Sequence, residues 1–251
     1  FSEIQEEHYA PAMTRGMKLN LEEIAAVANN PEAPTFENTI VAMERSGALL
    51  TRSARTFFNL TGTDLTEGLQ ALRTEFAPKL AQHQDAIVLN EALFIRVKRL
   101  YDARETLGLD AEQLKLVEDY YRDFVRAGAT VRGADKERLK AINTELATLF
   151  TEYSKRLLKE NNYLLLLDKE EDLAGLPDEI KAAGAALGKQ RGHEGKWAYT
   201  LVRSSYEPFL KYSTRRDLRE KLWNAFHDRG SHDGERDTRE LSIQIATLRA
   251  E

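Results

Sequence analysis

The sequence contains no cysteine among its 251 residues. Disulfide bonds, thiol nucleophiles and zinc sites with cysteine ligands are therefore excluded. Long apolar runs are missing too: short runs such as residues 164–167 fall far short of the roughly 18 residues that a membrane helix needs. Positive charge is not in excess, because the formal net charge is -5 at pH 7. We therefore expect neither a nucleic-acid partner nor a membrane span.

Motifs of common catalytic sites are missing as well. No G-x-S-x-G element marks a serine hydrolase, and no glycine-rich pattern forms a phosphate-binding loop. The closest approach is GHEGKW, in which His193 and Glu194 begin the zinc-protease motif H-E-x-x-H but Trp197 replaces the second histidine. That motif needs a regular helix, so that both histidines reach one ion. Because glycines surround this pair, we interpret it as part of a solvated loop.

A second histidine pair lies nearer the end of the chain. His227 and His232 are surrounded by carboxylates, a composition that can bind zinc or manganese. However, Gly230 separates them, and Arg229 and Arg236 would repel a cation. We interpret this segment as a polar loop between two helices.

Two further histidines stand alone in the sequence. His8 follows an acidic start, and His83 lies on the polar face of a predicted helix, after Leu80. We expect a surface or capping role for both. The residues alone thus predict no catalytic, cofactor-binding or metal-binding site.

The sequence does contain the apolar spacing of amphipathic helices. In four segments, apolar side chains recur three and four residues apart, and charged residues occupy the other faces. These segments are residues 69–87, 93–107, 114–125 and 139–157. The predicted fold class is therefore mainly α, a multi-helix, bundle-like body whose short connections favour antiparallel neighbours.

Polar residues and glycines predict several helix ends. Thr35 is a good N-cap for the helix that follows it. Gly108 is expected to end the helix that directly precedes it. Asp135 is expected to cap the helix after the GATVRGAD connection. Asp237, with Glu240 three residues later, is close to a capping box for the last helix.

Near residue 160 the three-four apolar spacing of the predicted helices ends. Residues 163–168 and 197–202 are short runs rich in apolar, aromatic or β-branched residues, and both predict strands. They can pair as one small β-ribbon, with an alanine-rich helix after Pro177 between them. We therefore expect two regions: 1–159, an N-terminal helical region, and 160–251, the ribbon with further helices.

Residues 203–221 place several cations among aromatic side chains. Such a surface can hold the carboxylate end of a peptide or pair with a partner domain. The simpler interpretation is a helix start with i,i+4 partners such as Arg216 and Glu220. In that interpretation the tyrosine and phenylalanine side chains contribute to the core. Separately, Leu218, Leu222, Trp223 and Phe226 form one apolar stripe, which predicts a helix there.

Five longer segments, in order along the chain, strongly resemble the N-terminal part of the thimet oligopeptidase family, most of all the bacterial peptidyl-dipeptidases and oligopeptidase A. The segments are PTFENTIVAMERSGALLTRSARTFFNL (34–60), LNEALFIRVKRLY (89–101), DYYRDFVRAGA (119–129), LAGLPDEI (173–180) and YTLVRSSYEPFLKYSTRRDLREKLWNAF (199–226). This resemblance extends over nearly the whole chain.

The resemblance implies a zinc metallopeptidase, mostly helical, whose two halves close on a channel that admits short unstructured peptides. In that family an H-E-x-x-H helix and a later Glu hold the zinc, and the motif Glu activates the attacking water. Those residues belong to the C-terminal half, and none matches a position here. The chain is therefore expected to be a non-catalytic channel wall, with zinc only in the full-length parent and with short oligopeptides and the missing catalytic half as partners.

The chain begins at Phe1 without an initiator Met and stops at Glu251 within a predicted helix, so we expect a fragment. Division of a channel between its walls leaves apolar surface uncovered. We expect that surface, and self-association through it, at the stripe formed by Leu241, Ile245 and Leu248.

The sequence leaves two alternatives open. The chain can instead be a stand-alone helical binding or scaffold module without peptidase activity. Its location is expected to be the cytoplasm, with the periplasm as the alternative, because the native N-terminus is not visible.

Overall fold

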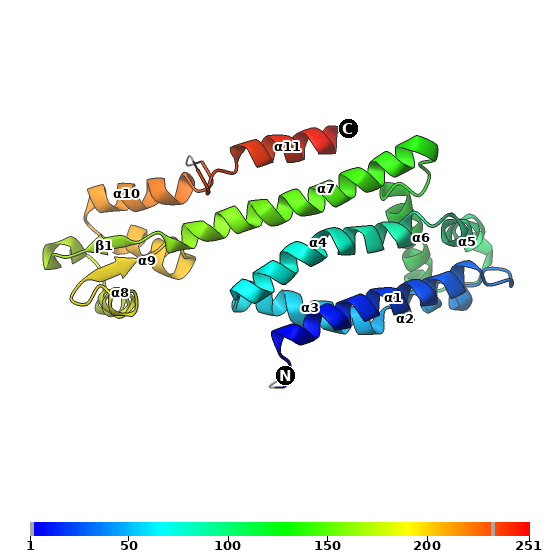
Figure 1. The fold of residues 1–251 in the computed structure, drawn as a ribbon, viewed down its shortest axis with the longest axis horizontal. Helices are drawn as coiled ribbons and strands as arrows, with labels where there is room; N and C mark the ends of the chain where they lie inside the picture. The colour runs from blue at the N-terminus through cyan, green and yellow to red at the C-terminus, as the bar shows by residue number, and fades with distance from the viewer. Residues whose placement is uncertain (1–2, 232–233) are drawn as a thin grey trace. The chain divides into compact units, whose positions relative to one another are not determined.

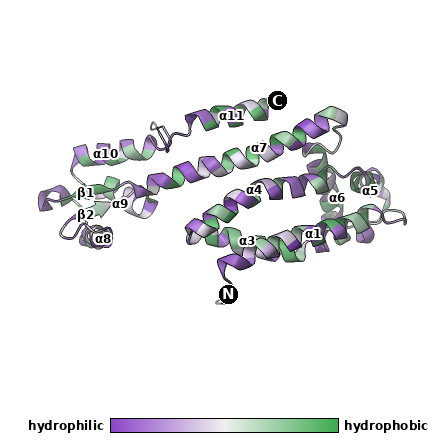
Figure 2. Ribbon diagram, viewed as in Figure 1, coloured by the Kyte–Doolittle hydropathy of each residue, from purple (hydrophilic) through white to green (hydrophobic). Residues whose placement is uncertain are grey.

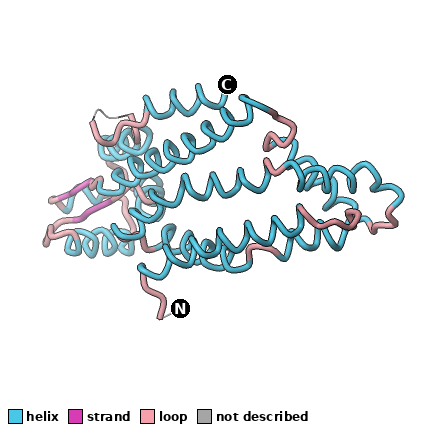
Figure 3. The backbone as a smooth tube through the Cα atoms, turned by 45° about the vertical axis from the view of Figure 1, so that its right-hand side comes forward, coloured by secondary structure: helices cyan, strands magenta, loops and turns pink. Residues whose placement is uncertain are grey.

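The computed structural model describes residues 3–231 and 234–251, and it is mainly helical, as the sequence predicts (Figures 1 and 3). Its contacts divide the chain into two compact units, residues 1–151 and 152–251. None of the described helices is both long enough and apolar enough to cross a membrane. The expected boundary between residues 159 and 160 stays a prediction.

The first unit consists of helices and short helical turns. Its elements are η1 (Glu6–His8), α1 (Tyr9–Ala28), η2 (Phe36–Val41), α2 (Ala42–Arg45), α3 (Ala48–Thr63), α4 (Glu67–Val88), α5 (Glu91–Ala103), η3 (Arg104–Thr106), α6 (Ala111–Arg126) and the first part of α7 (Gly133–Leu158). α1 packs along α3 and α4, and α5 packs on α6. Figure 2 shows polar and apolar residues alternating along these helices, as the three-four spacing requires.

Two apolar clusters hold this unit together. One joins α1, η2, α5 and α6 around Leu93, Val97 and Val117, each fully buried. The other joins α1, α3 and α4 around Met13 and Phe57. Residues that recur three and four apart in the sequence thus face a common interior.

The ends of the helices confirm some of the predicted caps and correct others. Thr35 caps η2: its Oγ1 accepts from the backbone N of Asn38 at 3.0 Å. Asp135 is not a cap, because α7 begins at Gly133 and Asp135 lies in its first turn. The predicted capping box at Asp237 is also wrong, since Thr238 occupies the N-cap position.

The second unit combines helices with the small β-ribbon. After the end of α7 come η4 (Lys159–Asn162), β1 (Leu165–Leu167), η5 (Glu170–Leu173), α8 (Asp178–Gln190), β2 (Trp197–Tyr199), α9 (Arg203–Tyr212), α10 (Arg216–His227) and α11 (Arg239–Ala250). β1 and β2 pair antiparallel, with Leu165 opposite Tyr199 and Leu167 opposite Trp197. The predicted ribbon is confirmed (Figure 3). Its strands are shorter than the apolar runs 163–168 and 197–202 that indicate them.

The ribbon and three helices share one core. Leu165 and Tyr199 from the strands meet Phe209 of α9 and Leu222 of α10, and all four are at most 2% exposed. α8 packs on β2 through Gly184, where an added Cβ would lie 2.7 Å from the Tyr199 hydroxyl oxygen. This core fixes the positions of α9 and α10.

The exposed apolar stripe expected on the last helix is a wrong prediction. On α11, Leu241 and Ile245 are buried, at 7% and 8% exposure, and Leu248 is half-buried. The large apolar side chain that α11 leaves in solvent is Ile243, which is 67% exposed. The stripe therefore gives no reason to expect self-association.

Candidate functional site

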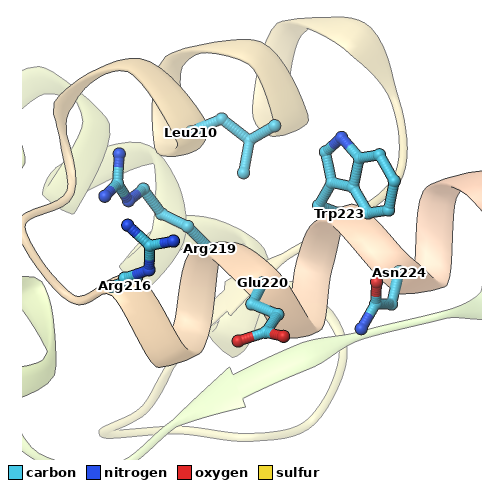
Figure 4. Close-up of a pocket in the computed structure, with 6 residues that line it drawn as sticks. All are labelled: Leu210, Arg216, Arg219, Glu220, Trp223 and Asn224. Carbon is cyan, nitrogen blue, oxygen red and sulfur yellow. The ribbon is translucent and has the colours of Figure 1, made fainter.

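A hollow of about 430 Å³ opens between α9 and α10 in the second unit (Figure 4). It lies within the segment where the sequence gathers cations and aromatics. α9 contributes one lining residue and α10 the others; the lining consists of Leu210, Arg216, Arg219, Glu220, Trp223 and Asn224. In Figure 4 the two arginines lie together at one end, and Trp223 and Asn224 lie at the other.

The turn between α9 and α10, residues 213–215, is held in place by hydrogen bonds. Arg215, just before α10, binds Asp217 through two hydrogen bonds of 3.0 and 2.7 Å, and it also pairs with Asp172. These bonds raise the pKa of Arg215 and lower that of Asp217. Farther along, the rings of Tyr206 on α9 and Phe226 on α10 stack with centroids 4.2 Å apart.

The hollow contains cations without close counter-ions. The ion pair expected between Arg216 and Glu220 does not form in the described part of the chain, where Arg216 has no ion pair. Arg219 buries its Nε without a hydrogen-bond partner. Arg216 is exposed, and its guanidinium group is well suited to bind a carboxylate, which it can contact through two parallel N–H groups.

Trp223 supplies an apolar wall to the hollow. It is 48% exposed, although its spacing places it in an apolar stripe whose other members, such as Leu222, turn inward. Its ring stacks on that of His227, with centroids 3.8 Å apart. Nδ1 of His227 lies 2.8 Å from the Trp223 carbonyl oxygen, so this nitrogen carries the proton and donates.

The arrangement can bind, but it assembles no catalytic group. An exposed indole beside two guanidinium groups offers an apolar face and an anion site, the features that accommodate the carboxylate end of a peptide. Ser213, which precedes α10, uses its Oγ to accept from the backbone N of Arg215 and is itself buried. No nucleophile–base pair lines the hollow.

The histidines singled out from the sequence lie apart from this hollow or at its margin. His193 and Glu194 lie in the loop between α8 and β2, where Glu194 pairs with Lys189 at 3.9 Å, so the loop interpretation is confirmed. His227 ends α10, and His232, the other histidine of the segment interpreted as a polar loop, lies outside the described residues. Among the described residues, no three His, Asp or Glu side chains are grouped so as to hold a metal ion.

The two lone histidines have different roles. His8 has the expected capping role, because its Nδ1 accepts from the backbone N of Gln5 at 3.0 Å. His83 does not lie on the surface: it is 7% exposed, and its Nε2 is 2.9 Å from Oδ1 of Asn20. The polar face that the sequence indicates for His83 packs against α1.

Two buried carboxylates were not identified from the sequence. Asp85 on α4 is 5% exposed and Glu160 in η4 is 1% exposed. Glu160 accepts from Arg236 at 3.2 Å and from the backbone N of Gly230 at 3.4 Å, so it anchors the loop after α10. No local pattern marks either residue, because the partners lie far away in the sequence.

Comparison with known proteins identifies similar chains. No family model matches. The chain is 39% identical, over 100% of its own length, to "Dipeptidyl carboxypeptidase" of Escherichia coli (strain K12). It is 27% identical over its full length to "Oligopeptidase A" of the same organism, and 24% identical to "Organellar oligopeptidase A, chloroplastic/mitochondrial" of Arabidopsis thaliana.

These matches confirm the resemblance carried by the five sequence segments. They extend from one end of the chain to the other, so no part of it stands outside the similarity. The chain spans only 37% of the dipeptidyl carboxypeptidase and 38% of the oligopeptidase A.

Proposed function

We propose that residues 1–251 form a non-catalytic, helical channel wall of a zinc-dependent oligopeptidase or peptidyl-dipeptidase that hydrolyses short peptides. The observation that carries this proposal is the 39% identity over 100% of the chain to a dipeptidyl carboxypeptidase of which the chain spans 37%. Identity at this level over 252 aligned residues supports a common architecture. Because the chain spans 37% of this relative, the other part of the relative is long enough to form a separate catalytic part.

The described residues do not fit a zinc site of their own. A catalytic zinc needs about three protein ligands that converge on one ion, and no such group exists among them. The zinc and its ligands, an H-E-x-x-H helix and a later Glu, are therefore proposed to lie in the remaining part of the longer protein.

Within the longer protein, this chain would bind and limit substrates rather than cleave them. Short oligopeptides are the proposed substrates, and the catalytic part is the proposed partner of this chain. The hollow between α9 and α10 supports a contact with a peptide carboxylate, because Arg216 and Arg219 line it beside Trp223. The proposed location is the cytoplasm, with the periplasm as the alternative.

The second candidate is a stand-alone helical binding module. The same hollow favours it, since a guanidinium–indole pair binds a carboxylate without any catalytic half. The two candidates differ in what the gene encodes after residue 251. The first requires a continuous reading frame that contains H-E-x-x-H; the second does not.

The experiment is to sequence the gene downstream and to express both lengths of chain. We expect an open frame with the H-E-x-x-H motif, and peptide cleavage by the longer protein only. A stop codon soon after residue 251, with peptide binding by residues 1–251 alone, would overturn the first candidate in favour of the second.

A further inference from the structure

The hollow between α9 and α10 has polar groups that a carboxylate leaves unused. One guanidinium group can match a carboxylate through two parallel N–H groups, whereas Arg216 and Arg219 both line the hollow. The lining also includes Glu220 and Asn224. Neither of these side chains forms a hydrogen bond or ion pair within the described part of the chain. A ligand that meets all four groups has more than one polar part.

The lining residues of α10 share one face of that helix. They occupy positions i, i+3, i+4, i+7 and i+8 of a single stripe: Arg216, Arg219, Glu220, Trp223 and Asn224. Because a helix rises about 1.5 Å per residue, Trp223 lies about 6 Å along the axis from Arg219 and about 10 Å from Arg216. In Figure 4 the arginines lie at one end, Trp223 and Asn224 at the other, and Glu220 between them.

The arginine end fits a phosphate group. Arg216 is exposed and has no ion pair in the part of the chain that the structure describes. Arg219 is half-buried, and its Nε is covered without a partner, which leaves its terminal nitrogens as the donors for a ligand. A phosphate monoester carries about −1.5 to −2 charge at pH 7 and three acceptor oxygens, so it can pair with two guanidinium groups at once.

The opposite end fits a nucleobase. The indole of Trp223 stacks on His227 and is still 48% exposed, so its other face is open to a flat ring. Bases of every kind stack on aromatic side chains, because each base has a π-face. The exposed amide of Asn224 both donates and accepts, as the edge of an adenine requires.

The middle of the hollow fits a sugar. Glu220 is exposed there, and its carboxylate can accept hydrogen bonds from the hydroxyl groups of a ribose, as an acidic residue does in dinucleotide sites. A carboxylate in a hollow that otherwise attracts anions thereby has a partner. The order of groups along α10 is the order of phosphate, sugar and base in a nucleotide.

We propose that the hollow between α9 and α10 binds a nucleoside 5′-monophosphate with adenine as its base. The phosphate pairs with Arg216 and Arg219, the ribose donates to Glu220, and the base stacks on Trp223. The hollow, of about 430 Å³, falls in the range of roughly 300–1,000 Å³ usual for small-molecule sites. No bond is made or broken. In the longer protein a bound nucleotide would exclude a peptide carboxylate from the same guanidinium groups, and that consequence alone rests on the proposed function.

The test is a titration of ¹⁵N-labelled residues 1–251 with adenosine 5′-monophosphate, followed by NMR. The chain has two tryptophans, so two indole N–H signals are expected, and Trp223→Phe assigns the one in the hollow. We expect a saturable shift of that signal. Adenosine, which lacks the phosphate, and ribose 5-phosphate, which lacks the base, should each bind at least about tenfold more weakly.

Variants of the protein assign the two ends of the nucleotide. Arg216→Gln should weaken adenosine monophosphate by about tenfold and leave adenosine unchanged, because only the phosphate loses a partner. Trp223→Ala should remove the preference for adenosine monophosphate over ribose 5-phosphate, measured from the backbone amides of α10. Lys221→Gln is the matched control, since Lys221 is an exposed cation on the same helix that does not line the hollow.

The carboxylate in the middle has its own test. The wild type should bind adenosine monophosphate about fivefold more tightly than the 2′,3′-dideoxy form, and Glu220→Ala should abolish that difference. Glu220 is exposed, so this variant keeps the fold. Equal affinity of the wild type for the two nucleotides would overturn the placement of the ribose.

Four results would overturn the proposal as a whole. They are no saturable shift at about 20 mM adenosine monophosphate, well above a millimolar dissociation constant; equal affinity for ribose 5-phosphate; unchanged affinity in Arg216→Gln; and equal or tighter binding of N-acetyl-L-phenylalanine, which would show a carboxylate site only. All are binding measurements on residues 1–251. They are therefore distinguishable from a failure of the proposed function, which would appear as missing peptide cleavage by the longer protein.

Discussion

His83 on α4 donates a hydrogen bond from Nε2 to Oδ1 of Asn20 on α1, across 2.9 Å. The direction follows from the other end of the amide: Nδ2 of Asn20 donates to Oγ of Ser46 at 3.1 Å, so its oxygen is the acceptor. Nδ1 of His83 is buried without a partner. A neutral imidazole with its proton on Nε2 therefore joins α4, α1 and the turn before α3.

This imidazole predicts how stability depends on pH. Burial lowers the pKa of His83 below the usual 6.5. As pH falls through 6.5, the unfolded chain takes up a proton that the folded chain does not, so the unfolded state gains stability. The contribution of the neutral ring is complete above 6.5 and is lost below it, down to the lowered pKa of the folded state.

We predict that His83→Gln reduces the pH dependence of the free energy of unfolding just below pH 6.5. The measurement is urea denaturation at a series of pH values. His193→Gln is the control, because His193 lies in a loop and should leave the pH profile unchanged. Parallel profiles for the wild type and His83→Gln would contradict the account.

Arg96 on α5 holds the segment before η2 in place. Its Nη1 donates to the carbonyl oxygens of Asn30 and Glu32, both at 2.9 Å. Its Nη2 donates to Oδ1 of Asn38 at 2.8 Å and to Oγ1 of Thr39 at 3.2 Å. Arg96 is only 5% exposed, so its loss would leave four acceptors partly unsatisfied.

We predict that Arg96→Lys lowers the free energy of unfolding by about 2–4 kcal/mol, because one ammonium group cannot reach all four acceptors. Chemical denaturation measures the change. Arg99→Lys on the exposed face of the same helix should change it by less than about 0.5 kcal/mol. An equal decrease in the free energy of unfolding in both variants would show that the four hydrogen bonds of Arg96 add no specific stability.

Two helical glycines predict opposite effects of the same substitution. Gly16 lets α1 approach α3, because an added Cβ would lie 2.8 Å from the backbone of Leu50. Gly62 near the end of α3 has no such neighbour within 4 Å. Gly16→Ala should therefore destabilise the protein, whereas Gly62→Ala should stabilise it by up to about 1 kcal/mol, the usual difference in helix propensity.

Thermal unfolding of both glycine variants tests this contrast. A higher melting temperature for Gly16→Ala would mean that helix propensity outweighs the close contact between α1 and α3. The account would then have misplaced that interface.

In the longer protein, the hollow between α9 and α10 predicts a change in KM. Arg216→Gln and Trp223→Ala should raise KM for short peptides and leave kcat unchanged, because they remove binding that is equal in the ground state and the transition state. Arg203→Gln, outside the hollow, is the control. Unchanged KM in both site variants would exclude substrate contact there.

The sequence alone predicts most of the secondary structure, because its signals are local. Apolar residues three and four positions apart predict the helices. Short apolar runs predict the two strands, Leu165–Leu167 and Trp197–Tyr199. Local signals fail where tertiary contacts decide. His83 follows a polar pattern yet is buried, because Asn20, 63 positions away in the sequence, provides its partner.

The candidate site was predicted only in outline. Composition placed cations and aromatics in one segment, but the pairing of Arg216 with Glu220 expected there does not form. Trp223 belongs to an apolar stripe by its spacing, yet it is 48% exposed, since α9 covers only part of that face. Which side of a stripe a second helix covers is a property of packing.

Zinc content and peptide cleavage together test the central claim most directly. Residues 1–251 and the longer protein are purified, analysed for metal by mass spectrometry, and assayed on a quenched fluorescent peptide with and without added zinc. The account predicts about one zinc per chain and chelator-sensitive cleavage for the longer protein, and neither for residues 1–251. One tightly bound zinc per chain, or chelator-sensitive cleavage, in residues 1–251 would contradict it.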